Sequence, residues 1–193
     1  MHKVLFIFFL LLAAIIPISA QQDGGTDPMM QKWMEYMTPG PEQEHLAKSA
    51  GEWKTEMKMW MAPDTEPTVS TGKSVSEMLL GGRYLQTKYY GDYNGMPMEG
   101  IALEAYDKGR KVFISTWIDN FGTGVMYMEG TYLKDSKQIE YTGKMYDPIA
   151  EKMIPVRELI TPVDNDHSKM EMFTTDENGK EWRTMLIEYT RMK

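Results

Sequence analysis

Hydrophobic and polar residues alternate through a series of short segments from Gly51 to Arg191, and each segment ends in a turn. The segments are rich in Tyr, Trp, Val, Ile, Thr and Met, which favour strands. No connection is long enough for a crossover helix, so neighbouring strands are expected to be antiparallel. The pattern predicts ten strands, at residues 52–61, 68–80, 83–90, 98–106, 111–118, 123–133, 138–146, 152–163, 168–175 and 181–191.

Strands joined by connections of hairpin length are expected to lie side by side in an up-and-down meander. An open sheet of ten strands would expose two unpaired edges, and closing the sheet into a barrel removes both. The alternative is a two-sheet sandwich, which needs longer Greek-key connections. The fold class predicted here is therefore all-β, an antiparallel up-and-down barrel that occupies residues 51–193.

Two short helices are expected before the barrel, in residues 28–50. Pro28 suits the first turn of a helix, and Met29, Trp33 and Met37 follow at helical spacing. The Pro39-Gly40-Pro41 segment ends this helix, and a second is expected from Glu42 to about Ser49. We expect the Met29, Trp33 and Met37 stripe to pack over one opening of the barrel, as a helical cap.

Residues 1–20 have the layout of a secretory signal peptide: Lys3, an apolar run from Val4 to Ile16, and small residues at Ser19 and Ala20. An uncleaved N-terminal anchor is the alternative. Residues 21–27 are polar and rich in Gly, which is typical of a flexible leader. The prediction is a secreted or periplasmic protein without a stable membrane anchor after cleavage.

Composition narrows the classes of function. The net charge is −7, and 28 acidic residues are present, which argues against non-specific binding of nucleic acid. The chain has no Cys, so disulfides and thiolate chemistry are excluded and no lipid can be attached to a Cys after the signal. The barrel must be stabilised by its core and strand ladders, which a domain of this size can achieve.

Gly51-Glu52-Trp53 stands where the second expected helix gives way to the first strand. Gly-x-Trp at this place resembles the first-strand signature of the calycins, the lipocalin and fatty-acid-binding group of barrels. The resemblance implies that Trp53 lies at the closed end, packed under an Arg of the last strand. Arg191 is the matching candidate, and Arg183 is the alternative.

The chain without its signal also resembles domain of unknown function 1579, a family of exported bacterial proteins. The resemblance implies a calycin-like barrel, and it brings no established activity, so no catalytic residues are carried over. The segments that carry it are Pro39-Gly40-Pro41-Glu42, His45-Leu46, Gly51-Glu52-Trp53, Leu80-Gly81-Gly82-Arg83-Tyr84-Leu85, Glu99-Gly100-Ile101, Thr116-Trp117-Ile118-Asp119 and Val156-Arg157-Glu158.

Methionine is unusually abundant, with 19 residues, and several occur two apart. Residues two apart on a strand share a face, so each pair is expected to point together into the barrel or out of it. Flexible thioethers suit a deformable apolar cavity, and ordinary core packing explains the pairs equally well. A Cu(I) site is a further alternative, although neither Cys nor a His cluster supports it. The pairs are Met57, Met59 and Met61; Met96 and Met98; Met126 and Met128; Met170 and Met172.

The sequence offers little support for other metal or cofactor sites, and we predict no metal ion and no cofactor. Asp164 and Asp166 have a calcium-like spacing, but Lys169 and Thr175 stand where an EF-hand needs Gly and Glu. His167 begins a predicted strand and could face the interior as a haem ligand, although a solvated turn histidine is the simpler interpretation.

The candidate ligand-binding residues are polar or aromatic side chains within the strands. Arg157 and Glu158 lie between Ile154 and Ile160, so one of the two must point inward. An inward Arg157 would clamp a ligand carboxylate; alternatively, it faces solvent or bonds a neighbouring Glu. Ordinary strand composition is the competing explanation for the aromatic members. The remaining candidates are Glu104, Tyr84, Tyr106, Trp117, Met126, Met128 and Tyr141.

These observations lead to one functional hypothesis and two alternatives. The hypothesis is a barrel that binds a small apolar or amphipathic molecule in its interior. The first alternative is an enzyme that acts on a small lipid-like or cyclic substrate, for which two ionisable groups within hydrogen-bond reach would be needed. The second is a filled barrel that serves as an envelope or interaction protein without a ligand.

Overall fold

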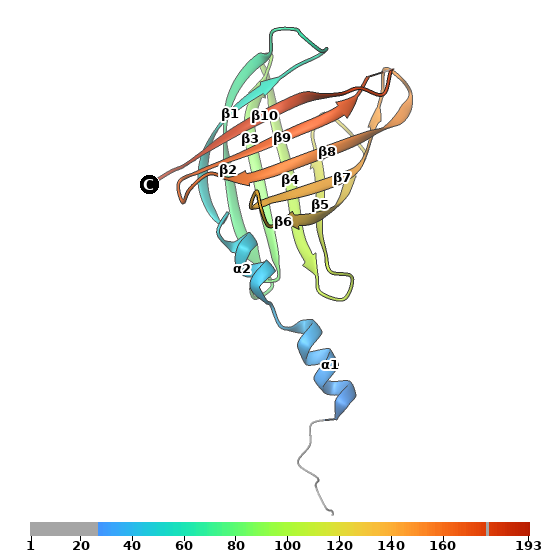
Figure 1. Ribbon diagram of the computed structural model, residues 1–193. Coiled ribbons are helices and arrows are strands. Elements are labelled where there is room, and N and C mark those ends of the chain that lie inside the picture. Colours follow the sequence, from blue (N-terminus) through green and yellow to red (C-terminus); the bar gives the residue numbers. More distant parts are fainter. Residues whose placement is uncertain (1–26, 177) are drawn as a thin grey trace, which may run out of the picture.

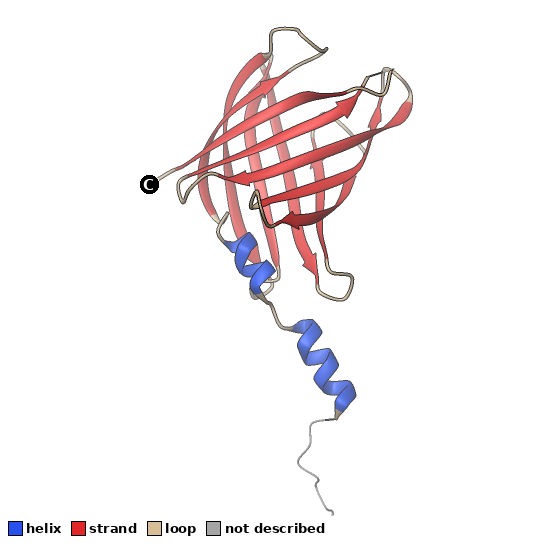
Figure 2. Ribbon diagram, viewed as in Figure 1, coloured by secondary structure: helices blue, strands red, loops and turns tan. Residues whose placement is uncertain are grey.

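The computed structural model describes residues 27–176 and 178–193, and over this range the chain forms a closed antiparallel barrel of ten strands (Figures 1 and 2). The expected signal peptide, and all but the last residue of the expected leader, lie outside the described residues. The strands are β1 Gly51–Met59, β2 Thr68–Leu79, β3 Tyr84–Tyr93, β4 Met96–Asp107, β5 Val112–Asp119, β6 Met126–Leu133, β7 Gln138–Asp147, β8 Lys152–Pro162, β9 His167–Thr175 and β10 Glu181–Arg191.

Each strand pairs with its neighbours in sequence, and β1 also pairs with β10, which closes the barrel. The closing register places Trp53 opposite Arg191 and Thr55 opposite Tyr189. Because every described strand has a partner on both sides, the sheet has no unpaired edge among them. The predicted up-and-down barrel is confirmed, and closure rules out the two-sheet sandwich.

Strand boundaries differ from the prediction by a few residues. The largest differences are three residues: β3 continues to Tyr93 instead of residue 90, and β6 begins at Met126 instead of residue 123 because the residues before it form a bend and a coil. Gly122 and Gly124 fall in this stretch, and glycine weakens a strand because it has the most backbone entropy to lose.

The short helix α2 (Pro41–Ala47) lies against one end of the barrel. Its Leu46 side chain is buried in the core, and Gln43 is buried beside the backbone of β4, donating from Nε2 to the Tyr106 carbonyl at 3.0 Å. The Gln43 Oε1 atom accepts from the backbone N–H of Gly40 at 2.8 Å. Both ends of this amide are therefore satisfied, which fixes α2 over the opening.

The helix α1 (Pro28–Met37) projects away from the barrel instead of covering it (Figure 1). None of its ten residues is buried, and Trp33 is 55% exposed, so the expectation that its Met and Trp stripe packs over the opening is wrong. Only the C-terminal end of α1 is held, because Lys108 Nζ donates to the Glu35 carbonyl at 2.7 Å and Arg83 Nη2 donates to that of Met37 at 2.7 Å. Among the described residues, neither helix is long and apolar enough to cross a membrane.

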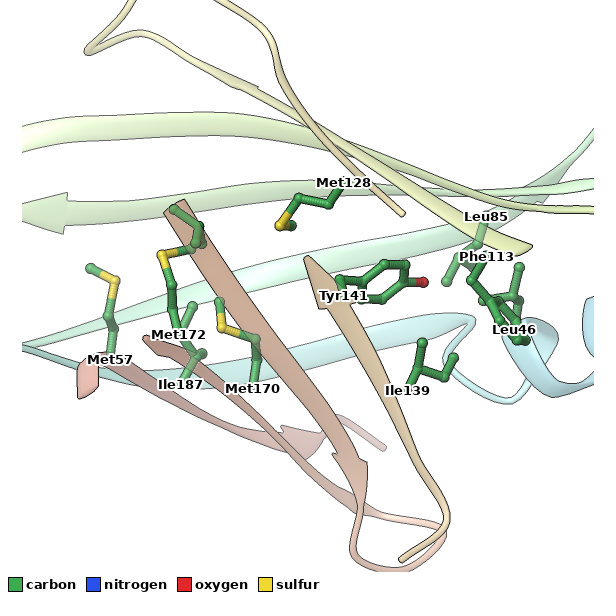
Figure 3. Packing of buried hydrophobic residues seen from close by; sticks show 11 residues of the cluster. Leu46, Met57, Leu85, Phe113, Met128, Ile139, Tyr141, Met170, Met172 and Ile187 are labelled. Atoms are coloured by element: carbon green, nitrogen blue, oxygen red, sulfur yellow. The ribbon is translucent and has the colours of Figure 1, made fainter. Parts of the chain in front are cut away.

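The buried hydrophobic side chains of the barrel fall into two groups, most of which Figure 3 shows. One group, the packed region, includes Leu46 of α2 and lines no cavity; the other group lines the cavity described below. The packed region comprises Leu46, Leu85, Phe113, Met128, Ile139, Tyr141 and Val156. The second group comprises Trp53, Met57, Tyr89, Met170, Met172 and Ile187. Only part of the barrel interior is therefore filled.

Candidate functional site: the barrel cavity

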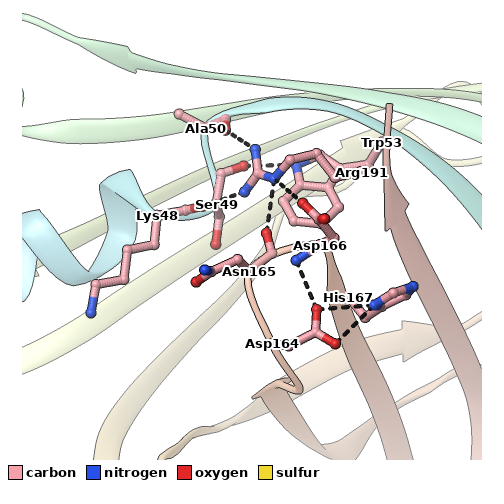
Figure 4. A network of polar contacts seen from close by, with 9 residues as sticks. All are labelled: Lys48, Ser49, Ala50, Trp53, Asp164, Asn165, Asp166, His167 and Arg191. Carbon is pink, nitrogen blue, oxygen red and sulfur yellow. Dashed lines mark hydrogen bonds and ion pairs between the residues drawn. The ribbon is translucent and has the colours of Figure 1, made fainter. Parts of the chain in front are cut away.

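The floor of the barrel is closed by Trp53 and Arg191 (Figure 4). The Arg191 guanidinium lies 4.0 Å from the centroid of the Trp53 ring, and its Nη1 and Nη2 atoms donate to the carbonyls of Ala50 and Lys48, both at 2.8 Å. The Trp53 indole donates to the Ser49 carbonyl at 2.9 Å. Two hydrogen bonds from Arg191 therefore tie the last strand to the segment that follows α2. The cation–π contact joins the last strand to Trp53 of β1, which is itself bonded to that segment.

Gly51 is required by this arrangement. Its φ is +129°, and a Cβ atom there would lie 2.6 Å from Nη1 of Arg191. Arg183, the alternative partner, instead lies over Trp60 at 4.7 Å and pairs with Glu171. The resemblance to the calycin signature therefore identified the correct arginine.

His167 stands outside the barrel interior. It is half exposed at the start of β9, and its Nδ1 atom lies 2.9 Å from an Asp164 carboxylate oxygen (Figure 4). It is absent from the lining of the cavity. His167 thus behaves as the turn histidine that the sequence allowed, and its position offers no route to an interior ligand.

A cavity of about 680 Å3 occupies the barrel interior beside the packed region. Residues of the β1–β2, β5–β6 and β7–β8 connections form its mouth, at the end of the barrel away from α2, and Trp53 lies at its floor. The volume falls within the range of roughly 300–1,000 Å3 that is usual for small-molecule sites. The interior can therefore accommodate a ligand.

Nine methionines line this cavity, and the Met pairs supply most of them. Met57, Met59 and Met61 all face it from β1 and the turn that follows, and Met170 and Met172 face it from β9. Met128 shares the inward face with Met126 but belongs to the packed region. Met96 is exposed, whereas Met98 lines the cavity. Much of the wall is therefore flexible, polarizable and apolar.

Two carboxyl groups face the cavity, Glu104 from β4 and Glu158 from β8. These strands are separated by β5, β6 and β7 in the closed barrel. The Tyr141 hydroxyl donates to Glu104 Oε1 at 3.0 Å. Burial raises the pKa of Glu104, and the bond from Tyr141 opposes this only in part. Glu104 is therefore a buried acid with a single hydrogen-bond donor.

Glu158 is 7% exposed and has no hydrogen-bond donor among the described residues. Burial, and then the nearby charge of Glu104, raise the pKa of Glu158 to about 8. Burial raises the pKa of Tyr189, and the charges of Glu158 and Glu104 add to this. The lining contains no Lys, Arg or His from residues 27–176 and 178–193, so nothing described there compensates the two acids.

Two hydroxyl groups of the cavity wall also lack partners. Ser74 Oγ and the Tyr89 hydroxyl are buried and make no hydrogen bond within the described part of the chain. The Tyr89 ring lies against β2 and β3, where Gly72 and Gly91 are paired and leave room for it because they have no side chains. A Cβ atom on Gly72 would lie 2.8 Å from the Tyr89 hydroxyl. Buried hydroxyls without partners are costly, so unpaired hydrogen-bonding groups accumulate in this wall.

Arg157 faces outward, which corrects the expectation that it clamps a ligand inside the barrel. Its guanidinium pairs with Glu181 and with Glu140 at 3.2 Å, and it lies 4.3 Å from the centroid of the Phe173 ring. The reason is strand alternation: Glu158 takes the inward position beside it. The alternative that Arg157 bonds neighbouring Glu residues describes the structure.

The other predicted site residues separate into three groups. Glu104, Trp117 and Met126 line the cavity. Met128, Tyr141 and Tyr106 point inward but belong to or pack against the packed region, with Tyr106 and Phe113 ring centroids 4.9 Å apart. Tyr84 is not part of the lining, and its neighbour Leu85 is the residue that points inward.

Sequence reasoning missed Glu158, Tyr89, Ser74 and Tyr189 as cavity residues. The sequence did contain a signal for Glu158. It lies an even number of positions from Ile154 and Ile160, so all three share one face of the strand, and both isoleucines also line the cavity. The signal for Tyr89 was the presence of glycines inside strands, which mark places where another group approaches the backbone closely.

The described ranges contain no group of three or more His, Cys, Asp or Glu side chains able to hold a metal ion. The arrangement of the cavity instead suits an organic molecule: an apolar wall, aromatic rings such as Trp117 and Tyr89 with centroids 6.5 Å apart, and a few unpaired polar groups.

Solved structures with the same fold differ widely from this chain in sequence. The crystal structure of Rv2717c from M. tuberculosis matches with a TM-score of 0.60 and 13% identity, covering 81% of this chain and 100% of that chain. The S-type phycobiliprotein lyase CPES from Guillardia theta matches with a TM-score of 0.56 and 12% identity, covering 79% and 93%. At such identities the likeness concerns the fold alone.

No curated protein matches the sequence. A family model described as "Protein of unknown function (DUF1579)" does match, over residues 38–191. This range includes α2, all ten strands, Glu104, Glu158 and the Trp53–Arg191 contact, and it leaves out α1. The chain therefore belongs to the DUF1579 family.

Proposed function

We propose that this protein is an exported carrier that holds a small apolar or amphipathic molecule in the cavity of its barrel. The observation that carries the proposal is the cavity of about 680 Å3 with an apolar, methionine-rich wall. A protein that needed only a stable barrel would gain from filling this space, because each unfilled volume forfeits packing energy.

The mouth of the cavity supports entry of an apolar molecule. Its rim includes Met61, Phe121, Tyr146 and Ile149, which are between 47% and 89% exposed. Large exposed apolar side chains gathered in one place mark binding sites more often than ordinary surface. They favour capture of an apolar ligand, which then passes into the methionine-lined interior.

Native mass spectrometry of the protein purified from its own host tests the proposal. We expect a non-covalent adduct, whose molecule can be extracted and identified. Ala102→Phe puts a ring into the cavity, so this variant should lose the adduct. Leu103→Phe is the matched control, because Leu103 is exposed and lies next in sequence, on the other face of β4. Absence of an adduct from wild type, or its retention by a folded Ala102→Phe variant, would contradict the proposal.

Export is the second part of the proposal, and it is supported by the signal-like residues 1–20. N-terminal sequencing of the protein recovered from its host tests this part. We expect the mature chain to begin at Gln21 and to be found outside the cytoplasm. Recovery of a chain that keeps residues 1–20 would favour an N-terminal anchor instead.

A catalytic role is the second candidate, favoured by the Tyr141–Glu104 hydrogen bond of 3.0 Å beside the cavity. With Glu158, whose pKa is raised to about 8, the cavity has groups able to move a proton on a small lipid-like or cyclic substrate. One structural neighbour is named a lyase, so the fold also occurs in an enzyme. Incubating the extracted ligand with the protein in D2O should then introduce deuterium into the ligand, and Glu104→Gln should stop this; no exchange in wild type would remove the candidate.

A further inference from the structure

We propose that the ligand carries a positively charged nitrogen, a protonated amine, which binds against the carboxyl groups of Glu104 and Glu158. This inference rests on the proposed function, because it names the polar end of the molecule that the cavity holds. The ligand charge proposed here is opposite in sign to the one expected from the sequence, which predicted that Arg157 binds a ligand carboxylate.

The first argument is the charge of the lining. Two carboxyl groups, Glu104 and Glu158, face the interior, and Asp119 and Asp147 lie nearer the mouth. No basic side chain of the described ranges lines the cavity, and Arg157 is held outside by Glu140 and Glu181. A ligand carboxylate would therefore find two acids and no cation to pair with, whereas an ammonium group would form charge-assisted hydrogen bonds with the ionised carboxylates.

The second argument is the unpartnered state of Glu158. Its side chain is more than nine-tenths buried, faces the cavity, and accepts no hydrogen bond from the described residues. Polar groups left without partners at this depth are costly in the empty protein, and a ligand that donates hydrogen bonds removes the cost.

The third argument is the aromatic wall. Tyr89 and Trp117 line the cavity with ring centroids 6.5 Å apart, and Trp53 lies at its floor. Aromatic faces attract cations more strongly when water is excluded. The apolar part of the amine is accommodated by the methionines, as the proposed function requires.

The two acids also make the affinity for an amine depend on pH. In the empty protein Glu158 keeps its proton near neutral pH, and binding of an ammonium ion favours the ionised form, so that the proton leaves to solvent. Three titratable groups are coupled to Glu158. The charge of Glu104 on β4 raises the pKa of Glu158, and the charge of Glu158 in turn raises the pKa values of Tyr141 on β7 and Tyr189 on β10. The tyrosines stay neutral, since burial raises their pKa values. Affinity for an amine is therefore expected to rise with pH while the amine itself stays protonated.

Calorimetric titration of the full mature chain tests the inference with three probes of one chain length: dodecylamine and dodecanoate below their micelle concentrations, and dodecanol below its solubility limit. We expect dodecylamine to bind one per chain and at least tenfold more tightly than dodecanol, with dodecanoate the weakest. With a pKa of about 8 for Glu158, affinity for dodecylamine should rise roughly 50-fold from pH 6 to pH 8.

The variant Glu104→Gln/Glu158→Gln should lose the preference for dodecylamine and keep its affinity for dodecanol. Glu140→Gln is the matched control, because Glu140 pairs with Arg157 on the outer face, and it should bind dodecylamine like wild type. Equal binding of dodecanoate, an affinity that falls with pH, or an unchanged double variant would overturn the inference while leaving the carrier proposal in place. Failure of all three probes to bind wild type would overturn both.

Discussion

The packed region and the cavity belong to the same barrel, yet they differ in the partners of their most deeply buried polar groups. Beside the packed region, Gln43 is bonded at both ends of its amide, and the Tyr141 hydroxyl has Glu104 as its acceptor. In the cavity, Ser74 and Glu158 have no described partner. Satisfied groups and tight packing thus stabilise the barrel, whereas the Glu158 carboxyl stands without a partner where a ligand can reach it.

The apolar side chains of the two regions differ as well. Leu46, Leu85, Phe113 and Ile139 dominate the packed region, whereas methionines dominate the cavity. Leu, Ile and Phe have few rotamers and specify one arrangement, whereas Met adapts to whatever it contacts. We therefore expect substitutions in the packed region to cost stability, and those in the cavity to alter binding.

The largest expected effect is that of Phe113→Ala in the packed region. Phe113 is 3% exposed, and its removal should lower the free energy of unfolding by about 4 kcal/mol, through lost burial and the hole left behind. Met126→Ala, in the cavity wall, should cost less than about 1 kcal/mol, because the space beside it is already open. Urea unfolding measures both. Equal losses of unfolding free energy in the two variants would contradict the distinction between a packed region and an open cavity.

Glu158→Gln should raise the free energy of unfolding by about 3 kcal/mol at pH 7, with a further rise toward pH 9, and change it little at pH 4. The pKa of Glu158 is raised from 4.5 to about 8 in the folded state, so between these values the folded chain binds the extra proton. Stability from this group is fully present below about pH 4.5 and lost as pH rises to about 8. Urea unfolding across this range measures it; an unstabilised Glu158→Gln variant at pH 9 would contradict the account of an unpaired acid.

Arg191→Ala should cost about 2 kcal/mol, because it leaves the carbonyls of Ala50 and Lys48 without their donor and uncovers Trp53. Arg183→Ala is the matched control: it also removes a cation–π contact on β10 but no bond to a carbonyl, and should cost less than about 1 kcal/mol. Thermal unfolding compares the two. A larger loss for Arg183→Ala would show that the floor of the cavity is held elsewhere.

The smallest expected effect is that of Trp33→Ser in α1. Trp33 is 55% exposed on a helix without buried residues, so the change should alter the free energy of unfolding by less than about 0.5 kcal/mol. Leu46→Ala, in α2, should cost about 3 kcal/mol by comparison, because Leu46 is buried in the packed region. Similar losses for the two, measured by urea unfolding, would mean that α1 does pack on the barrel in solution.

The fold was predictable from the sequence because its determinants are local. Alternation set the strands, hairpin-length connections set their order, and the cost of unpaired edges required closure. The pairing of Trp53 with Arg191 followed from a resemblance, since no pattern of spacing joins two residues so far apart in the sequence. The amphipathic stripe around Trp33 predicted a helix correctly, but amphipathicity does not say what, if anything, the helix packs against.

The cavity was less predictable because it depends on which inward positions meet in space. Arg157 and Glu158 are adjacent, and alternation allows only one inside; their parity with Ile154 and Ile160 was the evidence that decides between them. The position of Tyr89 against Gly72 depends on the register between strands, which alternation does not give. Whether inward side chains fill the space or leave a hollow follows from their combined volumes around the closed barrel.

The most direct test of the central claim is an experimental structure of the protein purified from its own host without unfolding. The account predicts electron density for one non-protein molecule in the cavity, with a nitrogen within hydrogen-bond distance of Glu158 or Glu104 and apolar atoms against Met57 and Met172. Density for ordered water alone, or side chains collapsed into the cavity so that it is filled, would contradict it.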